Sequence, residues 1–356
     1  MKITFATTWE DRCGIADYSR ALAAELRKHA EIEIVSLDCD APKSPSYLAS
    51  KLNEGDIAHI QHQYPFFGGM RIYRNTFRRT IVKLNVPLVV TLHELDLHTR
   101  RSLFGPAYLR WFNRRLFRGD EIDRLIVHTE EYRRTLAGLG VRPEIVRVIP
   151  EGVPPVEMPT NSPDDAKAEL GLSVRRTVTI FGFMIRRKGY DIALEALRSL
   201  PEDVSLIIAG GWHPTQGTGF HDQVIERIRS EGLSDRVIVT GYLPKEKVPL
   251  VMAATDIVIA PYNEISNSGS LLKTIAYGKP IIASDLPATR EINERKSCLA
   301  LVPPQDPVAL AAKIGALLEN QWMRETLAQS AASHAETYSV EWAAAQTLAV
   351  YKELLD

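Results

Sequence analysis

The sequence predicts an α/β protein made of two units, each built on a doubly wound parallel sheet. Two series of short β-branched segments alternate with helical segments, and a proline-rich stretch separates the two series. Such alternation is typical of parallel sheets that carry helices on both faces. At 356 residues, of which 45% are hydrophobic and 24% charged, the chain is long enough for two domains of ordinary size.

The first series runs from the N-terminus to residue 149. We expect strands at residues 2–7, 31–37, 57–61, 88–92, 125–128 and 145–149, where apolar and β-branched residues cluster. A loop over 8–18 leads into a helix expected over 19–29, and this loop places Gly14 near the carboxyl end of the first strand, where open α/β sheets bind ligands. The chain has no Gly-x-Gly-x-x-Gly pattern, so a nicotinamide or flavin dinucleotide fold is disfavoured.

The second series follows a predicted linker. Residues 150–165 contain five prolines and no periodic pattern, which is typical of an interdomain segment. Strands are expected at 176–182, 205–209, 236–240, 256–260 and 281–284, with helices at 190–200, 221–231, 245–254 and 343–355. We therefore expect an N-terminal domain over 1–160, a C-terminal domain over 161–337, and a final helical segment over 338–356.

A candidate anion site follows the strand expected at 256–260. There the segment Asn267-Ser268-Gly269-Ser270-Leu271 opens a helix, with serines of the N-cap type and a glycine that lets a ligand approach the backbone. Unpaired amides and the positive end of the helix dipole attract an anion at such a point. We interpret the segment as a cradle for a diphosphate; an ordinary strand–helix–strand step with a capped helix is the alternative.

A second candidate lies after the strand expected at 176–182. Arg186, Arg187 and Lys188 lie in a loop bounded by Gly182 and Gly189, at the carboxyl end of that strand. Lysine neutralises a phosphate as a compact charge, and arginine binds it with two parallel hydrogen bonds. Either these are solvated loop charges, or Lys188 converges with the segment 267–269 on one anion.

Histidines accompany two strands of the first series. His93 closes the strand 88–92 at its carboxyl end, where an open sheet presents its crevice, and histidine suits hydrogen bonding to a sugar or a phosphate. For His59 and His62, in and beside the strand 57–61, a packed or surface position is the simpler interpretation.

A basic and aromatic region extends over residues 71–118. Eleven basic residues there accompany only Glu94 and Asp96, a local excess of nine positive charges. The basic residues are Arg71, Arg74, Arg78, Arg79, Lys83, Arg100, Arg101, Arg110, Arg114, Arg115 and Arg118. Such a surface would lie on an anionic leaflet, at about 1 kcal/mol for each basic residue near it, or bind a phosphorylated acceptor. The alternative is a pair of amphipathic helices whose arginines are solvated.

The composition also excludes several classes of protein. A formal net charge of −1 and the lack of a known binding module argue against nucleic acid as a partner. The three cysteines are far apart and form no Cys-x-x-Cys, so the sequence indicates neither a disulfide framework nor a zinc site and fits a reducing cytosol. No apolar run approaches the roughly 18 residues of a membrane span, and residues 1–6 are too short for a signal peptide. We expect a cytoplasmic protein, at most peripheral at the inner face of a membrane.

Several short motifs occur in a fixed order along the chain. In the first half they are Cys13-Gly14-Ile15-Ala16, His59-Ile60-Gln61, Thr91-Leu92-His93, Val148-Ile149-Pro150 and Gly152-Val153. In the second half they are Gly182, Lys188-Gly189-Tyr190-Asp191, Leu271-Leu272-Lys273 and Ala276-Tyr277-Gly278-Lys279-Pro280-Ile281-Ile282-Ala283-Ser284. Over nearly its whole length the chain thereby resembles the GT-B glycosyltransferases of the large retaining family 4.

This resemblance implies two Rossmann-like domains that face an interdomain cleft. The first would bind the acceptor, the second would hold most of the nucleotide sugar, and the last helix would cross back to the first. The resemblance implies a metal-independent hexosyltransferase without a cofactor, which moves a hexose from a nucleotide-diphosphate sugar to a glycan, lipid-linked or small-molecule acceptor. The matching positions make His93 a ligand of the sugar and Lys188 a stabiliser of the leaving phosphate.

The chain also departs from the family pattern. The family carries two glutamates with seven residues between them, one beside the donor sugar and one on the ribose, and Ile265 and Lys273 occupy these positions. Glu264 lies one residue earlier, and Phe183 stands where the family has an arginine after Gly182.

Two hypotheses follow. In the first the chain is a working retaining glycosyltransferase with His93, Lys188 and Glu264 as catalytic residues. In the second it is a catalytically degenerate GT-B binding or regulatory subunit. Gly14, His93 and Lys188 match the family, so we favour the enzyme. The candidate substrate-binding residues are Gly14, Arg186, Arg187, Asn267, Ser268, Gly269, Ser270, Leu271 and Lys273.

Overall fold

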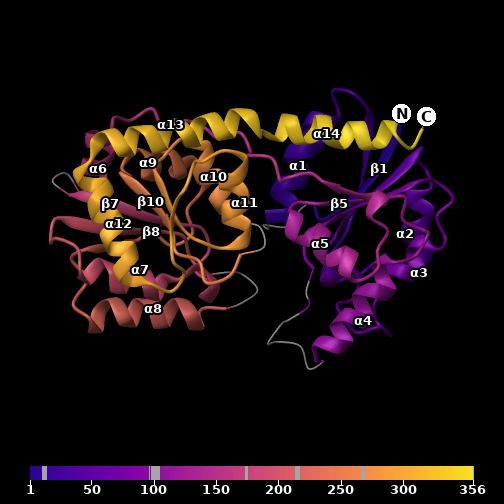
Figure 1. Cartoon of the computed structure of the whole chain (residues 1–356), viewed down its shortest axis with the longest axis horizontal. Coiled ribbons are helices and arrows are strands. Elements are labelled where there is room, and N and C mark those ends of the chain that lie inside the picture. The colour runs from indigo at the N-terminus through magenta and orange to yellow at the C-terminus, as the bar shows by residue number, and fades with distance from the viewer. Residues whose placement is uncertain are drawn as a thin grey trace. The chain divides into compact units, whose positions relative to one another are not determined.

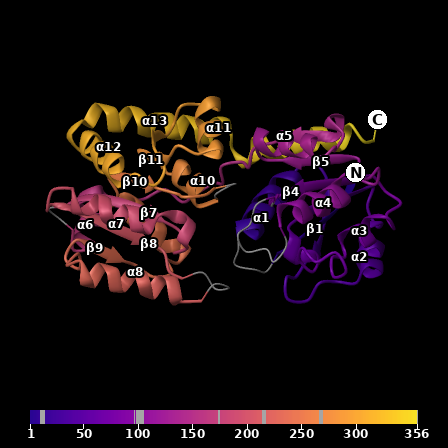
Figure 2. The same ribbon diagram turned by 60° about the horizontal axis from the view of Figure 1, so that its bottom comes forward.

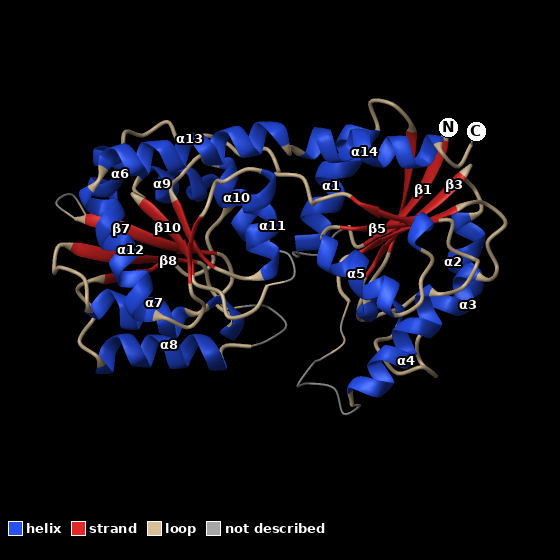
Figure 3. Ribbon diagram, in the orientation of Figure 1, coloured by secondary structure: helices blue, strands red, loops and turns tan. Residues whose placement is uncertain are grey.

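The computed structural model contains two compact α/β units. It describes residues 1–9, 14–95, 97, 105–172, 175–212, 217–265 and 269–355. The first unit comprises Met1–Gly152 together with Tyr338–Asp356, and the second comprises Val153–Thr337. Each has a layer of strands between helices (Figure 1, Figure 3). The boundary lies after Gly152, whereas the sequence analysis places it at residue 160, and the C-terminal segment groups with the unit that begins the chain.

A fully parallel sheet of six strands forms the first unit, in the order β2-β1-β3-β4-β5-β6. The strands are β1 Lys2–Thr7, β2 Glu31–Ser36, β3 Ile57–His62, β4 Leu88–Leu92, β5 Arg124–Val127 and β6 Val146–Val148. Every residue of β3 and β4 is buried, as expected for central strands that are covered on both faces. All six strands were expected, with bounds that differ by no more than one residue at either end.

Helices cover both faces of this sheet. They are α1 Gly14–Leu26, α2 Pro45–Leu52, α3 Phe77–Ile81, α4 Pro106–Phe117, α5 Glu130–Gly138 and α14 Val340–Lys352, with 3₁₀ turns η1 Tyr64–Phe67 and η2 Pro143–Ile145. The C-terminal helix α14 lies beside α1 (Figure 1, Figure 2), where Ala343 and Leu22 belong to one buried cluster. Ser339 caps α14 by accepting a hydrogen bond from the Trp342 amide, and Glu353 past its end forms ion pairs with Arg124 and Arg147.

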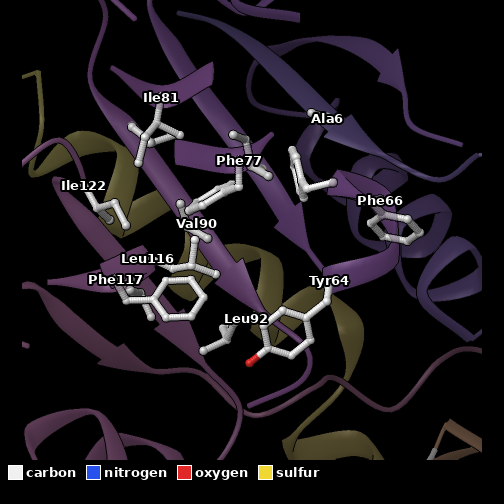
Figure 4. Packing of buried hydrophobic residues seen from close by; sticks show 14 of the residues in the cluster. Ala6, Tyr64, Phe66, Phe77, Ile81, Val90, Leu92, Leu116, Phe117 and Ile122 are labelled. Atoms are coloured by element: carbon white, nitrogen blue, oxygen red, sulfur yellow. The ribbon is translucent and has the colours of Figure 1, made fainter. Parts of the chain in front are cut away.

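The larger core of the first unit is rich in aromatic side chains. Phe77 and Phe117 approach Val90 of the central strand from helices α3 and α4 (Figure 4). The imidazole of His62 lies in this core, surrounded by the rings of four aromatic residues, Tyr64, Phe67, Phe77 and Phe117. His62 is therefore a packed core residue, in agreement with the simpler interpretation of the sequence.

The second unit contains another fully parallel sheet, in the order β12-β11-β10-β7-β8-β9. The strands are β7 Arg176–Phe181, β8 Val204–Ala209, β9 Val237–Val239, β10 Ile257–Ala260, β11 Ile281–Ser284 and β12 Ala300–Val302. The helices are α6 Pro163–Glu169, α7 Tyr190–Arg198, α8 Gly219–Ser230, α9 Val248–Ala253, α10 Gly269–Ala276, α11 Pro287–Arg295, α12 Pro307–Glu319 and α13 Gln321–Thr337, with 3₁₀ turns η3 Arg186–Lys188 and η4 Lys245–Lys247.

Some predicted bounds were wrong, for identifiable reasons. Helix α1 begins at Gly14 rather than at residue 19, because Ala16, Ser19 and Leu22 form a buried face with a three-residue spacing. Helix α6 begins inside the expected linker, because the Ser162 hydroxyl caps it and Pro163 occupies its first turn. The edge strand β12 was not predicted, since it has three residues and two of them are only half-buried.

Among the described residues, no helix combines the length and the apolar character that crossing a membrane would require.

The burial of His62 predicts a pH-dependent stability. Neither of its ring nitrogens has a hydrogen-bond partner on another residue in the described part of the chain, and burial lowers its pKa to about 3. An unfolded chain protonates this imidazole near pH 6.5. The stabilisation is therefore complete above pH 6.5 and is lost as the pH falls towards 3, by about 2 kcal/mol at pH 5.

Replacing His62 with methionine, which is apolar and of similar size, should remove this loss. We expect urea denaturation of His62→Met to show about 2 kcal/mol less decline in unfolding free energy between pH 7 and pH 5 than the wild type. The exposed His29 supplies a matched control, since His29→Met should keep the wild-type decline. An identical decline in His62→Met and wild type would contradict a neutral, buried His62.

Candidate functional site

The candidate site in the second unit lies where the direction of strand order changes. Strand β7 pairs with β8 on one side and with β10 on the other, so the loops after β7 and β10 leave the sheet next to each other. The ligand-binding crevices of open α/β sheets occur at such switch points. The two loops also touch: the amide of Asn263 donates to the carbonyl of Arg187 at 2.8 Å.

Lys188 is the buried cation of this region, with 6% of its surface exposed. Its ammonium donates to the Phe181 carbonyl at 3.0 Å and to the Ser270 hydroxyl at 2.9 Å, and it lies 5.8 Å from the centre of the Tyr262 ring. Burial lowers the pKa of Lys188 to about 7, and the nearby charge of Arg187 adds to the effect. Both oxygens that Lys188 contacts are uncharged, so an anion placed here would stabilise its charged form.

Glycines permit this arrangement. Gly182 has a φ of +102°, and a Cβ at this position would lie 2.3 Å from the Lys188 Nζ. Gly189 has a φ of +69°, and its Cβ would lie 1.9 Å from the Pro261 carbonyl oxygen. Side chains at these two positions would push the lysine or the loop after β10 away, which explains why the loop is bounded by glycines. Tyr190, next to Gly189, donates its hydroxyl to the Gly182 carbonyl at 3.0 Å.

The two arginines of the loop take different positions. Arg186 is exposed; it donates to the Gln223 side chain at 2.8 Å, and its guanidinium lies 4.9 Å from the centre of the Phe220 ring, so helix α8 holds it. Arg187 is also exposed, and its positive charge contributes to the lowered pKa of Lys188.

The remaining candidates of the second unit follow β10. Gly269 and Ser270 form the start of α10, and Ser270 brings its hydroxyl to Lys188, whereas the side chain of Leu271 is buried in the core. Lys273 lies half-buried one turn further along α10, and Glu264 is exposed. Two candidates, Asn267 and Ser268, lie outside the described residues. Ile265, at the position of a family glutamate, packs against a hydrophobic cluster that contains Leu271 and Leu272.

In the first unit, the candidates lie at the carboxyl ends of the strands. His93 follows β4 and is half-buried, and its Nε2 lies 2.7 Å from the Gln61 Oε1. Its ring contacts the rings of Tyr18 and His128, with centres 5.4 and 5.1 Å apart. Burial, followed by the neighbouring imidazoles, lowers the pKa of His93 well below its ordinary value, so His93 is neutral at neutral pH. Gly14 is the exposed first residue of α1, with open space where a Cβ would be.

Sequence reasoning missed several residues of these sites. Gln61 is buried in β3 and contacts both His59 and His93; a polar residue between two histidines of a buried strand was the available signal. Tyr262 lies with its hydroxyl 3.3 Å from that of Ser270, and it follows β10 in the sequence by two residues. Tyr190 is adjacent to the glycine that ends the basic loop.

In the described part of the chain, no group of three or more His, Cys, Asp or Glu side chains is arranged to hold a metal ion.

Comparison with known proteins gives matches in both units. Residues 175–320 match the family model described as "Glycosyl transferases group 1", and residues 40–157 match the model described as "Glycosyltransferase Family 4". The chain is 27% identical over 282 residues to the D-inositol 3-phosphate glycosyltransferase of Xylanimonas cellulosilytica, which covers 76% of this chain and 67% of that protein. It is also 27% identical over 293 residues to the MMP α-(1→4)-mannosyltransferase of Mycolicibacterium hassiacum, with 77% and 67% covered.

Solved structures agree on the fold. The Anabaena protein HepE, crystallised in complex with UDP and glucose, superimposes with a TM-score of 0.81 over 99% of this chain and 100% of its own, at 18% identity. In sequence, the chain spans between about half and two thirds of the length of the curated relatives that it matches. With the two parallel sheets and with family models matched in each half, the chain belongs to the family 4 (group 1) type of glycosyltransferases and has their GT-B fold.

Proposed function

We propose that the protein is a retaining glycosyltransferase that moves a hexose from a nucleotide-diphosphate sugar to a glycan, lipid-linked or small-molecule acceptor. The observation that carries the proposal is the buried Lys188, whose ammonium donates to two uncharged oxygens among the described residues, the carbonyl of Phe181 and the hydroxyl of Ser270. The names of the relatives, an inositol-phosphate glycosyltransferase and a mannosyltransferase, support hexosyl transfer. Structures of HepE with UDP and UDP-glucose support a nucleotide sugar as the donor.

The diphosphate of the donor would bind at the strand ends of the second unit. Lys188 and Arg187 would approach it from the loop after β7, and the amino end of α10 at Gly269 and Ser270 would approach it from the loop after β10, with Asn267 and Ser268 as further candidate ligands. Negative charge grows on the diphosphate as the glycosidic bond breaks. These cations and the helix dipole would stabilise that charge, and the acceptor would attack from the same face of the sugar.

The other candidates would act on the sugar or the acceptor. The first unit would bind the acceptor, with Gly14 leaving room near the backbone and with the neutral His93 forming a hydrogen bond to the sugar. Exposed Glu264 would supply the carboxylate that Ile265 does not, and Lys273 would contact the donor from α10. Arg186, which α8 holds, would reach the phosphate only after leaving Gln223. In this scheme the charge on the leaving group is met by side chains of the chain itself, so we propose that neither a metal nor a cofactor is needed.

A second candidate function has its own observation. Both glutamate positions of the family are altered, and Ile265 is packed against the core of the second unit, so no carboxylate extends from that position. A catalytically degenerate subunit that binds a nucleotide sugar without turning it over would have such a site.

Turnover separates the two functions. The purified protein would be incubated with UDP-glucose, UDP-N-acetylglucosamine, GDP-mannose and ADP-glucose, with and without a panel of sugar and inositol-phosphate acceptors, and release of the nucleoside diphosphate would be measured. We expect transfer, or slow hydrolysis, with at least one donor. Binding of a donor by calorimetry without any release of diphosphate would support the degenerate subunit, and absence of both binding and turnover would contradict both functions.

The pKa of Lys188 predicts a proton-linked donor affinity. Because this pKa is about 7, most of the free protein carries a neutral Lys188 at pH 8. A bound diphosphate favours the ammonium, so binding takes up a proton and the association constant should fall by up to about tenfold per pH unit above pH 7. A nucleotide sugar is the proper probe, since its diphosphate does not titrate in this range, and calorimetry at pH 6, 7, 8 and 9 measures the effect.

The variant Lys188→Met tests the origin of this dependence. It should bind the donor more weakly at pH 6 and show a nearly constant affinity up to pH 9, since the titrating group is absent. The control Lys43→Met removes an exposed lysine of the first unit and should behave like the wild type. Equal affinities of Lys188→Met and wild type at pH 6 would place the diphosphate elsewhere.

We further propose that the basic face of α4 associates peripherally with an anionic membrane at the cytoplasmic side. The exposed side chains of this segment include Arg110, Trp111, Arg114, Arg115 and Arg118. The opposite side of the helix, including Phe112 and Phe117, is buried in the core. The arginines are thus free to meet lipid phosphates while the exposed indole enters the interface. Arg100 and Arg101, which the sequence analysis adds to this region, lie outside the described residues.

Sedimentation with vesicles tests this surface. At low salt we expect the protein to sediment with vesicles of phosphatidylglycerol and phosphatidylcholine but not with phosphatidylcholine alone, and the bound fraction should fall as salt is raised. The double variant Arg110→Glu/Arg114→Glu should lose most of the bound fraction. Arg133→Glu/Arg134→Glu, on the exposed side of α5 in the same unit, makes the same change of charge and should lose much less. No sedimentation of the wild type at low salt would eliminate the membrane proposal.

A further inference from the structure

A continuous chain of polar side chains connects helix α14 to His93 inside the first unit. The Tyr351 hydroxyl of α14 lies 2.5 Å from the His59 Nδ1. On the other side of that ring, the Gln61 Nε2 lies 3.1 Å from the His59 Nε2, and the Gln61 Oε1 lies 2.7 Å from the His93 Nε2. Tyr351, His59 and Gln61 are fully buried, so solvent does not compete for these contacts.

The two imidazoles in this series of hydrogen-bonded side chains, those of His59 and His93, are neutral. Burial lowers the pKa of His59 to about 3, and burial together with neighbouring imidazoles lowers that of His93 well below its usual range. A neutral imidazole has one nitrogen that donates and one that accepts. Each hydrogen bond in the series therefore determines which nitrogen of the neighbouring ring carries the proton. As a result, the proton position on His59 determines the proton position on His93 through the Gln61 amide.

The orientation of the Gln61 amide gives the direction. Its Nε2, which can only donate, lies 3.1 Å from the His59 Nε2. The Thr91 hydroxyl lies 2.8 Å from the same nitrogen and is able to donate to it as well. The His59 Nε2 is therefore the accepting nitrogen, and the His59 proton is on Nδ1, from which it is donated to the Tyr351 oxygen. At the other end, the Gln61 Oε1 accepts the Nε2 proton of His93, which leaves the Nδ1 of His93 as an acceptor.

We propose that Tyr351, His59 and Gln61 are positioning residues that keep His93 protonated on Nε2, so that its Nδ1 accepts a hydrogen bond from a hydroxyl group of the sugar. The second half of this statement depends on the proposed function, and the first half does not. Without the Tyr351 oxygen, the Nδ1 proton of His59 would be buried and unpaired, which is unfavourable. His59 would move its proton to Nε2, the Gln61 amide would turn over, and His93 would become protonated on Nδ1 and present a donor to the same hydroxyl.

Nitrogen NMR reads the tautomer directly. The protein would be labelled with ¹⁵N-histidine, and His93→Gln would identify the two signals of His93. We expect the wild-type His93 to carry its proton on Nε2 and Tyr351→Phe to shift it substantially to Nδ1. The control Thr347→Val also removes a buried hydroxyl from α14, but one that bonds within its own helix, and it should leave His93 unchanged.

A second variant tests the proposal if Tyr351→Phe does not fold. Gln61→Leu interrupts the chain next to His93 and should also reduce the population protonated on Nε2. A wild-type His93 protonated on Nδ1, or a tautomer that neither Tyr351→Phe nor Gln61→Leu alters, would overturn the proposal.

Activity supplies an independent readout. In Tyr351→Phe the His93 Nδ1 changes from an acceptor into a donor, so the sugar hydroxyl would have to reverse its own hydrogen bond. We therefore expect kcat/KM for transfer to fall, by up to about tenfold, while Thr347→Val should retain the wild-type value. If the wild type transfers no sugar, the proposed function fails while the NMR result still decides on the tautomer. If the tautomer shifts in Tyr351→Phe but kcat/KM does not change, the role of the Nδ1 as an acceptor for the sugar is refuted.

Discussion

The contact between Lys188 and two uncharged oxygens is the constraint around which the strand ends of the second unit are built. An ammonium group loses much of its hydration when it is buried, and a carbonyl and a hydroxyl replace only part of it. Burial accordingly lowers the pKa of Lys188 to about 7, and the charge of Arg187 adds to the effect. Gly182 is required because any side chain would occupy the place of the ammonium. The loop is thus arranged to hold a cation that lacks a partner of opposite charge on the oxygens it touches, which is the condition under which an arriving anion gains the most.

The first unit treats its buried polar groups differently. Burial keeps His59, His62 and His93 neutral. Their stabilisation comes from hydrogen bonds between uncharged groups or, for His62, from packing among aromatic rings. A neutral imidazole can be buried at low cost, but its surroundings must favour one of its two tautomers. Hydrogen bonds from neighbouring side chains select the tautomer, and these side chains belong to strands of the sheet and to α14. The two units therefore differ in the polar groups that they bury. The second unit buries a cation whose contacts are uncharged, and the first buries neutral imidazoles whose hydrogen bonds set which nitrogen donates and which accepts.

Sequence patterns predicted the parts of this architecture that depend on local residue types. Runs such as residues 257–260 and 281–284 are short, apolar and β-branched, so their strands were found with correct bounds to within a residue. The sequence analysis predicted that Lys188 converges with residues 267–269 from separate strand ends, and Lys188 contacts Ser270, which directly follows that segment. Partners distant in sequence were beyond such reasoning: Arg186 is held by Phe220 and Gln223 of α8, and Tyr351 reaches His59 across 292 positions. No period or motif in either segment indicates these pairs, because they arise only when helices pack on the sheet.

The altered glutamate positions have a structural explanation that bears on both functional hypotheses. Ile265 is half-buried and packs against the hydrophobic cluster that contains Leu271 and Leu272 of α10, so a glutamate there would lose this apolar contact. Lys273, on the same helix as Ser270, adds positive charge on α10 where the family has negative charge. If this segment binds the donor as proposed, the altered positions would add attraction for the diphosphate and remove acceptors for ribose and sugar hydroxyls. In that case binding of the anion and selection of the sugar would be separable, so strong nucleotide binding by itself would be compatible with either function and the chemistry at the sugar carbon would decide between them.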